Sequence, residues 1–202
     1  MFGLPKSTEI NKPLSKKGIF DKFKPSPGDR KLFDEQVSRM AIVGEISPHT
    51  ASLAPGAVVH AIYIILVTLK VPDCSKKNIV LLSKLIDQRM VFALQYQDSV
   101  RLAVYRADQV FISDSKPAEE WKISLTGLDI GAVWDNLIAE IAGIEFGANA
   151  NLDQAIAETA RQSKLAKQVA DLEKKAMYEQ QPRRKWEYVN RIRELKDQLY
   201  NG

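Results

Sequence analysis

Cations and aromatic residues are mixed near the C-terminal end of the chain. Arg183, Arg184 and Lys185 form a run, Trp186 follows directly, and Arg191 lies five residues further on. Guanidinium and ammonium groups bind phosphates, and aromatic rings stack on nucleobases, so this mixture can hold a nucleic acid with salt-sensitive affinity. The sequence therefore makes Arg183, Arg184, Lys185, Trp186 and Arg191 candidates for nucleic-acid contact.

A structural explanation of the same cluster is favoured over the functional one. Glu187 and Arg191 are spaced as an ion pair on one face of a helix, which stabilises the helix itself. Trp186 is then expected to pack on the body of the protein or on another helix. Three cations at the opening turn oppose the helix dipole, however, and this cost keeps a binding role open.

Two short runs of apolar residues flank Pro182 with the spacing of helical seams. The first run ends at Ala176, and each run repeats at intervals of four, three and four residues. Because proline begins a helix readily but interrupts one, we expect two helices, at 153–178 and 182–200. The spacing leaves open whether they form a hairpin or a kinked rod. The residues expected to form a hairpin seam or a partner surface are Leu165, Val169, Leu172, Tyr188, Ile192, Leu195 and Leu199.

Strand and helix patterns alternate in the middle of the chain. The clearest strand is the Val- and Ile-rich segment 57–71, and Ser75 is a plausible cap for an amphipathic helix over 76–88. Further strands are expected within 31–47 and at 90–97, 101–113 and 120–130, with a helix after Gly131. These patterns predict an α+β fold: a mostly antiparallel sheet of about five strands, flanked by two helices and followed by a helical hairpin or coiled coil.

Charge and proline content divide the chain into three expected regions. Residues 1–32 hold eight lysines and arginines against three acids, residues 33–150 ten against fourteen, and residues 151–202 eleven against eight. Prolines at 5, 13, 25 and 27 disfavour regular structure at the start of the chain. We expect an extended basic arm at 1–30, an α+β body at 31–149 and a helical tail at 150–202. The expected apolar anchors of the arm are Phe2, Leu4, Ile10, Ile19, Phe20 and Phe23.

Several functional classes are disfavoured by what the sequence lacks. One cysteine, Cys74, and two histidines cannot supply a multi-cysteine zinc site, and a single cysteine fits a reducing, cytoplasmic compartment. No Gly-rich phosphate loop occurs, and the longest apolar run is too short to span a membrane. We expect no cofactor, no metal and no membrane. A metal-dependent nuclease built from Glu45, Asp98 and either Lys70 or Lys122 is a remote alternative, because no paired acidic motif ends consecutive strands.

Several separate stretches agree with one known family. They include "VSRMAIVGEISPHTASLAPG", "FALQYQDSVRLAVYR" and "LAKQVADLEKKAMYEQQPRRKWEYVN". Together they resemble a prokaryotic family of domains of unknown function, DUF4391. The resemblance implies an α+β body with a charged helical tail. It also implies a DNA-linked accessory role, since members are often encoded near superfamily 2 helicases and phage-defence genes, and it brings no assigned catalytic residue.

Three functions follow as hypotheses. The first is a non-enzymatic interaction module that docks on a protein partner, most readily a helicase-type protein of a prokaryotic DNA-transaction or phage-defence system. The second is a nucleic-acid-binding accessory protein that uses the basic tail and arm. The third and weakest is the cryptic nuclease.

Overall fold

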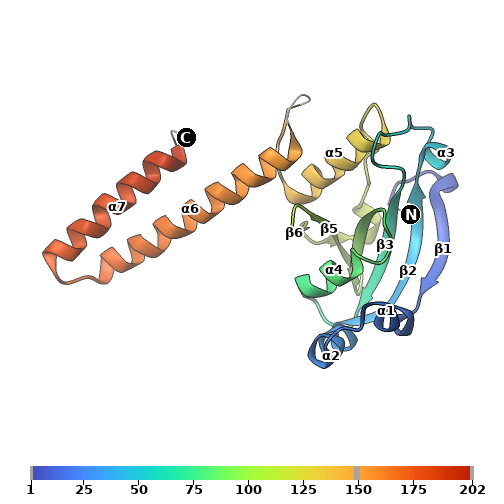
Figure 1. Ribbon diagram of the computed structural model, residues 1–202, viewed down its shortest axis with the longest axis horizontal. Helices are drawn as coiled ribbons and strands as arrows, with labels where there is room; N and C mark the ends of the chain where they lie inside the picture. Colours follow the sequence, from blue (N-terminus) through green and yellow to red (C-terminus); the bar gives the residue numbers. More distant parts are fainter. Residues whose placement is uncertain (1, 148–150, 201–202) are drawn as a thin grey trace. The chain divides into compact units, whose positions relative to one another are not determined.

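The computed structural model describes residues 2–147 and 151–200 (Figure 1). The chain divides into two compact units, Met1–Glu145 and Phe146–Gly202. Each unit is described by itself.

A mixed sheet forms the centre of the first unit. Its strands follow the order β1-β2-β3-β4-β5-β6, and the short strand β7 pairs with β5. Neighbouring strands are antiparallel except β3 and β4, which are parallel. The α+β class is therefore confirmed, but the sheet has seven strands and is not purely antiparallel. The strands are β1 (Glu9–Leu14), β2 (Val37–Ile46), β3 (Ile62–Leu69), β4 (Arg89–Tyr96), β5 (Ser99–Arg106), β6 (Gln109–Ile112) and β7 (Lys116–Pro117).

The parallel pair depends on the helix that connects its strands. A parallel connection must cross over the sheet, usually through a helix, and α4 (Lys76–Leu82) lies between β3 and β4. The Ser75 hydroxyl accepts a hydrogen bond from the Lys77 amide and begins this helix as expected. The helix ends at Leu82, six residues before the predicted end at Gln88. The chain then turns and enters β4 at Arg89.

The first thirty residues differ from the expected extended arm. They contain a 3-10 turn η1 (Lys6–Thr8), β1, helix α1 (Lys16–Phe23) and the start of α2 (Pro27–Gln36). Two of the prolines are compatible with these elements because they lie where the backbone does not need to donate a hydrogen bond. Pro13 lies on β1, at the edge of the sheet, and Pro27 occupies the first turn of α2.

Two strand predictions were wrong: one segment contains two strands instead of one, and the other forms no strand over residues 121–126. The segment predicted at 101–113 is a hairpin of β5 and β6, since Ala107 and Asp108 both have positive φ and form its two-residue turn. Residues 121–126, within the predicted strand at 120–130, form no strand, although Trp121 and Ile123 are buried and alternate as strand residues do. An alternation of buried residues does not reveal whether the backbone forms a ladder with a neighbouring strand. Residues 121–126 alternate in this way but form no ladder. The remaining short elements are α3 (Pro48–Ala51) and η2 (Ala118–Glu120).

Helices cover both faces of the sheet. One face packs against α1, α2 and α4, with Phe20, Phe33 and Ile79 in the same buried cluster as Ile65 and Phe92. Residues of the opposite pleat in β3, β4 and β5 are also buried, and α5 (Ile130–Ala142) contacts β5 and β6. The core therefore has two layers around a central sheet (Figure 1).

The second unit is a helical pair. Helix α6 (Leu152–Tyr178) begins at Asn151, whose side chain accepts hydrogen bonds from the Asp153 and Gln154 amides. Helix α7 is Pro182–Tyr200, and the two helices contact each other. The predicted bounds of both helices are thus confirmed within a residue.

Gly127 is a position where only glycine fits the fold. Its φ is +156°, and an added Cβ would lie 2.6 Å from the Val133 amide nitrogen, inside the first turn of α5. We expect Gly127→Ala to lower the free energy of unfolding of the first unit by about 2 to 4 kcal/mol, measured by urea denaturation. The control is Gly28→Ala, because the nearest atom to an added Cβ there is 4.0 Å away and alanine favours a helix. Equal stability of the two variants would contradict the argument.

Candidate interaction site on the C-terminal hairpin

The turn between α6 and α7 is built around Pro182. Proline has no amide hydrogen, so α7 begins at this residue without losing a hydrogen bond. The Lys185 amide donates to the Gln181 carbonyl at 3.0 Å, which closes the first turn of α7. The Gln181 amide donates to the Glu179 carboxylate at 3.0 Å and orders the loop. The proline therefore marks a helix start and not a kink within one helix.

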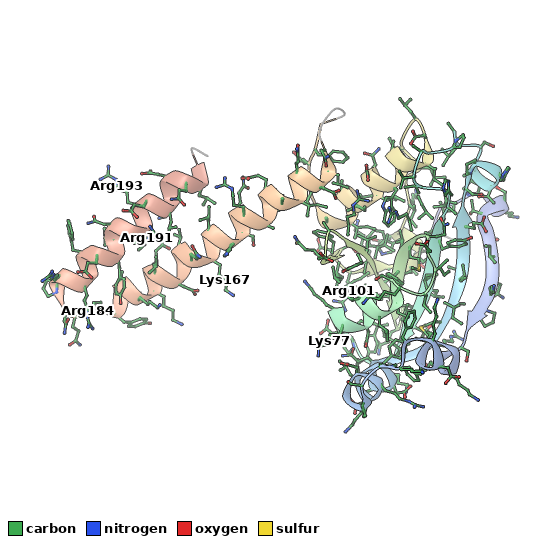
Figure 2. The ribbon with its side chains drawn as sticks, in the orientation of Figure 1. Lys77, Arg101, Lys167, Arg184, Arg191 and Arg193 are labelled. Carbon is green, nitrogen blue, oxygen red and sulfur yellow. The ribbon has the colours of Figure 1, made fainter. Side chains whose placement is uncertain are left out.

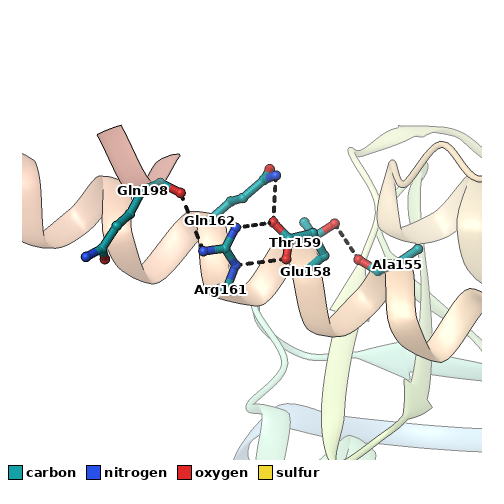
Figure 3. Close-up of polar contacts among 6 residues, drawn as sticks. All are labelled: Ala155, Glu158, Thr159, Arg161, Gln162 and Gln198. Carbon is teal, nitrogen blue, oxygen red and sulfur yellow. Dashed lines mark hydrogen bonds and ion pairs between the residues drawn. The ribbon is translucent and has the colours of Figure 1, made fainter. Parts of the chain in front are cut away.

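Contacts between residues far apart in sequence show that the helices fold back as a hairpin. The Lys196 ammonium lies 2.7 Å from the Glu173 carboxylate, across the pair. Nearer the start of α6, Arg161 donates to the Gln198 carbonyl at 3.5 Å, one of the last carbonyls of α7 that have no partner within their helix (Figure 3). These two contacts settle the alternative that the spacing left open.

Arg161 is held in place by an acid on its own helix. Two of its guanidinium nitrogens each lie 2.8 Å from a Glu158 oxygen, and Gln162 donates to the same carboxylate at 2.9 Å (Figure 3). The hydrogen bond from Arg161 lowers the pKa of Glu158, and the same bond raises the pKa of Arg161. This exposed pair positions the guanidinium that reaches α7.

The predicted seam residues lie on the sheltered side of the helical pair. Val169 and Leu195 are 7% and 3% exposed, and Ala176 of the first apolar run is also buried. The remaining predicted residues are half-buried: Leu165, Leu172, Tyr188, Ile192 and Leu199. Because the two helices shelter these side chains, a partner has little access to them while the hairpin stays closed. Any docking surface on the closed hairpin must use other residues.

Large apolar side chains are exposed at the turn end of the hairpin. Met177 and Tyr178 end α6 with exposed fractions of 75% and 72%, and Trp186 and Val189 in the first turns of α7 are 67% and 51% exposed. Within the second unit, Trp186 therefore does not pack on α6, contrary to the expectation that it could pack on another helix. Helical spacing identified the seam, but it did not single out Met177, Tyr178 and Val189, since their exposure depends on where the turn falls.

The four predicted cations all belong to α7, and Figure 2 labels two of them, Arg184 and Arg191. Arg183 lies 3.6 Å from Glu187, and Arg191 lies 2.7 Å from Glu194, so the expected pair of Glu187 with Arg191 is replaced by two others. Within the residues that the structure describes, the side chains of Arg184 and Lys185 form no ion pair or hydrogen bond. Two of the five predicted contact residues therefore have free charges beside the exposed Trp186.

A shallow hollow adjoins the same end of the hairpin. It is lined from α6 by Asp171, Lys174, Lys175 and Tyr178, from the turn by Glu179, and from α7 by Tyr188. Both charge signs and two aromatic rings meet there. We call the exposed residues Met177, Tyr178, Trp186 and Val189, together with Arg184 and Lys185, the turn-end surface. The name denotes residues near one end of the hairpin that include apolar area, aromatic rings and unpaired cations.

Glu45 and Lys70, two of the residues named for a nuclease, are not brought together. Glu45 pairs in register with Tyr63 near the start of β3, whereas Lys70 follows the last residue of that strand. A strand of this length separates them by roughly 20 Å. Across the described part of the chain, no group of three or more His, Cys, Asp and Glu residues could hold a metal ion. Burial raises the pKa of the Cys74 thiol to about 11, so the thiol is protonated at neutral pH.

The fold and its hairpin define a class before any relative is considered: an α+β body with a mixed sheet, joined to a helical hairpin with an exposed turn-end surface. The family model described as Domain of unknown function (DUF4391) matches residues 2–199, and the chain belongs to that family. No curated protein and no solved structure matches it. Among the described residues, no helix has the length and apolarity needed to cross a membrane.

Burial of the seam residues is expected to stabilise the closed hairpin. Leu195→Ala removes a buried side chain, and we expect the free energy of opening the hairpin to fall by about 2 to 4 kcal/mol. Hydrogen exchange of the α6 and α7 amides measures this change. Val189→Ala is the control, because Val189 is exposed in the same helix. Equal loss of protection in both variants would argue against the seam.

Proposed function

We propose that this chain is a non-enzymatic accessory module whose turn-end surface docks on a larger protein partner. The observation that carries the proposal is the exposure of four large apolar side chains, Met177, Tyr178, Trp186 and Val189, at one end of a closed hairpin. Contiguous exposed apolar areas are typical of interaction sites, and these four side chains lie within residues 177–189, on either side of one turn.

The composition of the turn-end surface suits a protein interface. Aromatic residues, methionine and arginine are enriched at protein contacts, and tryptophan, tyrosine and arginine dominate their binding energy. The surface combines all of them on two helices that hold each other in place. Little conformational entropy would therefore be lost when a partner binds, which favours affinity.

The partner class that we propose is a helicase-type protein in a prokaryotic DNA-transaction or phage-defence system. Support for this class comes from the family resemblance and not from the geometry. A single cysteine fits a reducing cytoplasm as the compartment. In this proposal any ATP-dependent work belongs to the partner, since the chain has no Gly-rich phosphate loop.

Direct nucleic-acid binding is the second candidate function, and one observation favours it. Arg184 and Lys185 have no acidic partner among the described residues, and they lie beside an exposed indole that could stack on a base. The N-terminal region offers less support. Lys16 is engaged with Asp34 at 3.2 Å, and Lys22 donates to the Leu85 carbonyl at 2.7 Å.

The docking proposal is tested by removing the exposed aromatic ring. We expect Trp186→Ser in the tagged full-length chain to reduce capture of a helicase-type protein from the native host by about tenfold, because an exposed tryptophan is a typical hot spot. Leu128→Ser is the matched control, since Leu128 is 95% exposed in the first unit. Undiminished capture by the Trp186 variant, or capture of no helicase-type protein by the unaltered chain, would overturn the proposal.

The second candidate is tested by the salt dependence of duplex DNA binding. Each phosphate contact contributes about 0.9 to the slope of log affinity against log salt, so a variant with both Arg184→Gln and Lys185→Gln should lower the slope by about 2. The control removes two exposed lysines of the first unit, by Lys76→Gln and Lys122→Gln. An absence of binding at low salt, or equal slopes in both variants, would remove this candidate.

A further inference from the structure

The first unit contains a cavity that the docking function does not use. Its volume is about 470 Å³, and it lies where the parallel strands β3 and β4 begin. Sites for small ligands commonly enclose roughly 300 to 1,000 Å³. The apolar part of the wall includes Val59, Ile86 and Met90, and the polar and aromatic part includes His60, Lys84, Asp87, Arg89 and Trp134.

Trp134 contributes a buried donor without an acceptor. Its side chain is 2% exposed, and its indole Nε1 has no hydrogen-bond partner in the described structure. The contrast with Trp121 is instructive, because the Nε1 of that buried residue donates to the Val100 carbonyl at 2.8 Å. Buried polar groups are nearly always paired, so the unpaired Nε1 sets Trp134 apart from ordinary core residues, although this atom is itself shielded and only the residue's ring lines the cavity.

The charged side chains at the edge of the cavity are available to a ligand, since Lys84 and Asp87 are exposed and Arg89 is half-buried. Within the described residues, His60, Lys84, Asp87 and Arg89 form no side-chain hydrogen bond or ion pair. By contrast, the hydroxyls of two other lining residues are already engaged, since Tyr105 donates to Asp108 at 2.9 Å and Ser83 to the Val80 carbonyl at 2.8 Å. Arginine and lysine together outnumber the one acid, so the cavity favours an anion.

The cavity wall is held by the fold and does not depend on a ligand. The Ile130 amide donates to the Ala54 carbonyl at 3.1 Å, which joins the start of α5 to the chain that leads into β3. Arg89 is the first residue of β4 and is paired in register with Ile62. Trp134 and Arg89 are therefore both carried by regular elements that the core fixes in place. A preformed site loses little entropy on binding.

We propose that this cavity binds a small phosphate ester. Arg89 and Lys84 provide positive charge for a phosphate dianion, which arginine recognises well because its planar donors match two oxygens. The carboxylate of Asp87 accepts a hydrogen bond from a hydroxyl of the ligand. The apolar wall, together with the ring of Trp134, contacts its carbon skeleton.

The experiment uses the 15N-labelled full-length chain, which has three indole signals because it has three tryptophans. The Trp134 signal is the one missing from Trp134→Phe, and the probes are adenosine 5′-monophosphate, ribose 5-phosphate and inorganic phosphate at constant ionic strength. We expect the Trp134 signal to shift with at least one of the two esters, while the Trp121 and Trp186 signals stay in place. No shift with either ester, or an equal shift with inorganic phosphate alone, would overturn the proposal.

A charge variant tests the same site without disturbing the core. Arg89→Gln should weaken ester binding about tenfold by calorimetry, because a charge-assisted hydrogen bond is lost. The control is Arg193→Gln, which removes an arginine of the second unit (Figure 2). An unchanged affinity in the Arg89 variant would contradict the site. The variant that combines Arg184→Gln and Lys185→Gln should bind the ester normally, which separates this proposal from nucleic-acid binding by the hairpin.

Discussion

The proline at position 182 is the constraint on which the C-terminal unit depends. A continuous helix through this point would leave two apolar runs on one long rod, where neither run could cover the other. Because Pro182 has no amide hydrogen and begins a new helix, the second run folds back and covers the first. Val169 and Leu195 are buried as a result. The same turn sets the exposed position of Trp186, so the seam and the turn-end surface have one cause.

Local rules predicted much of the fold because several elements obey them one by one. Ser75 caps α4, Pro182 begins α7, and the apolar repeat predicts the sheltered side of both C-terminal helices. The parallel pairing of β3 and β4 could not be predicted in this way, since it depends on where α4 leads the chain. The N-terminal prolines were misleading for a similar reason. Pro13 is tolerated because β1 lies at a sheet edge, which only the tertiary structure reveals.

The candidate sites were predictable to different degrees. The cations and Trp186 at the turn were identified from residue type, but the exposure of Met177 and Tyr178 required the structure. The cavity of the first unit was not predicted, because Lys84, Arg89 and Trp134 come from separate elements with no common motif. The sequence pattern predicts Trp134 only as a core residue of a helix. In the structure, its unpaired indole nitrogen distinguishes it from Trp121.

Site-specific photo-crosslinking tests the central claim most directly, because it reports which surface touches the partner. A photoreactive amino acid at position 189 lies on the turn-end surface, and one at position 128 lies on an exposed site of the first unit. The account predicts that position 189 cross-links in the native host to a helicase-type protein identified by mass spectrometry, and that position 128 does not. Cross-linking of that protein from position 128 alone, or of no helicase-type protein from position 189, would contradict it.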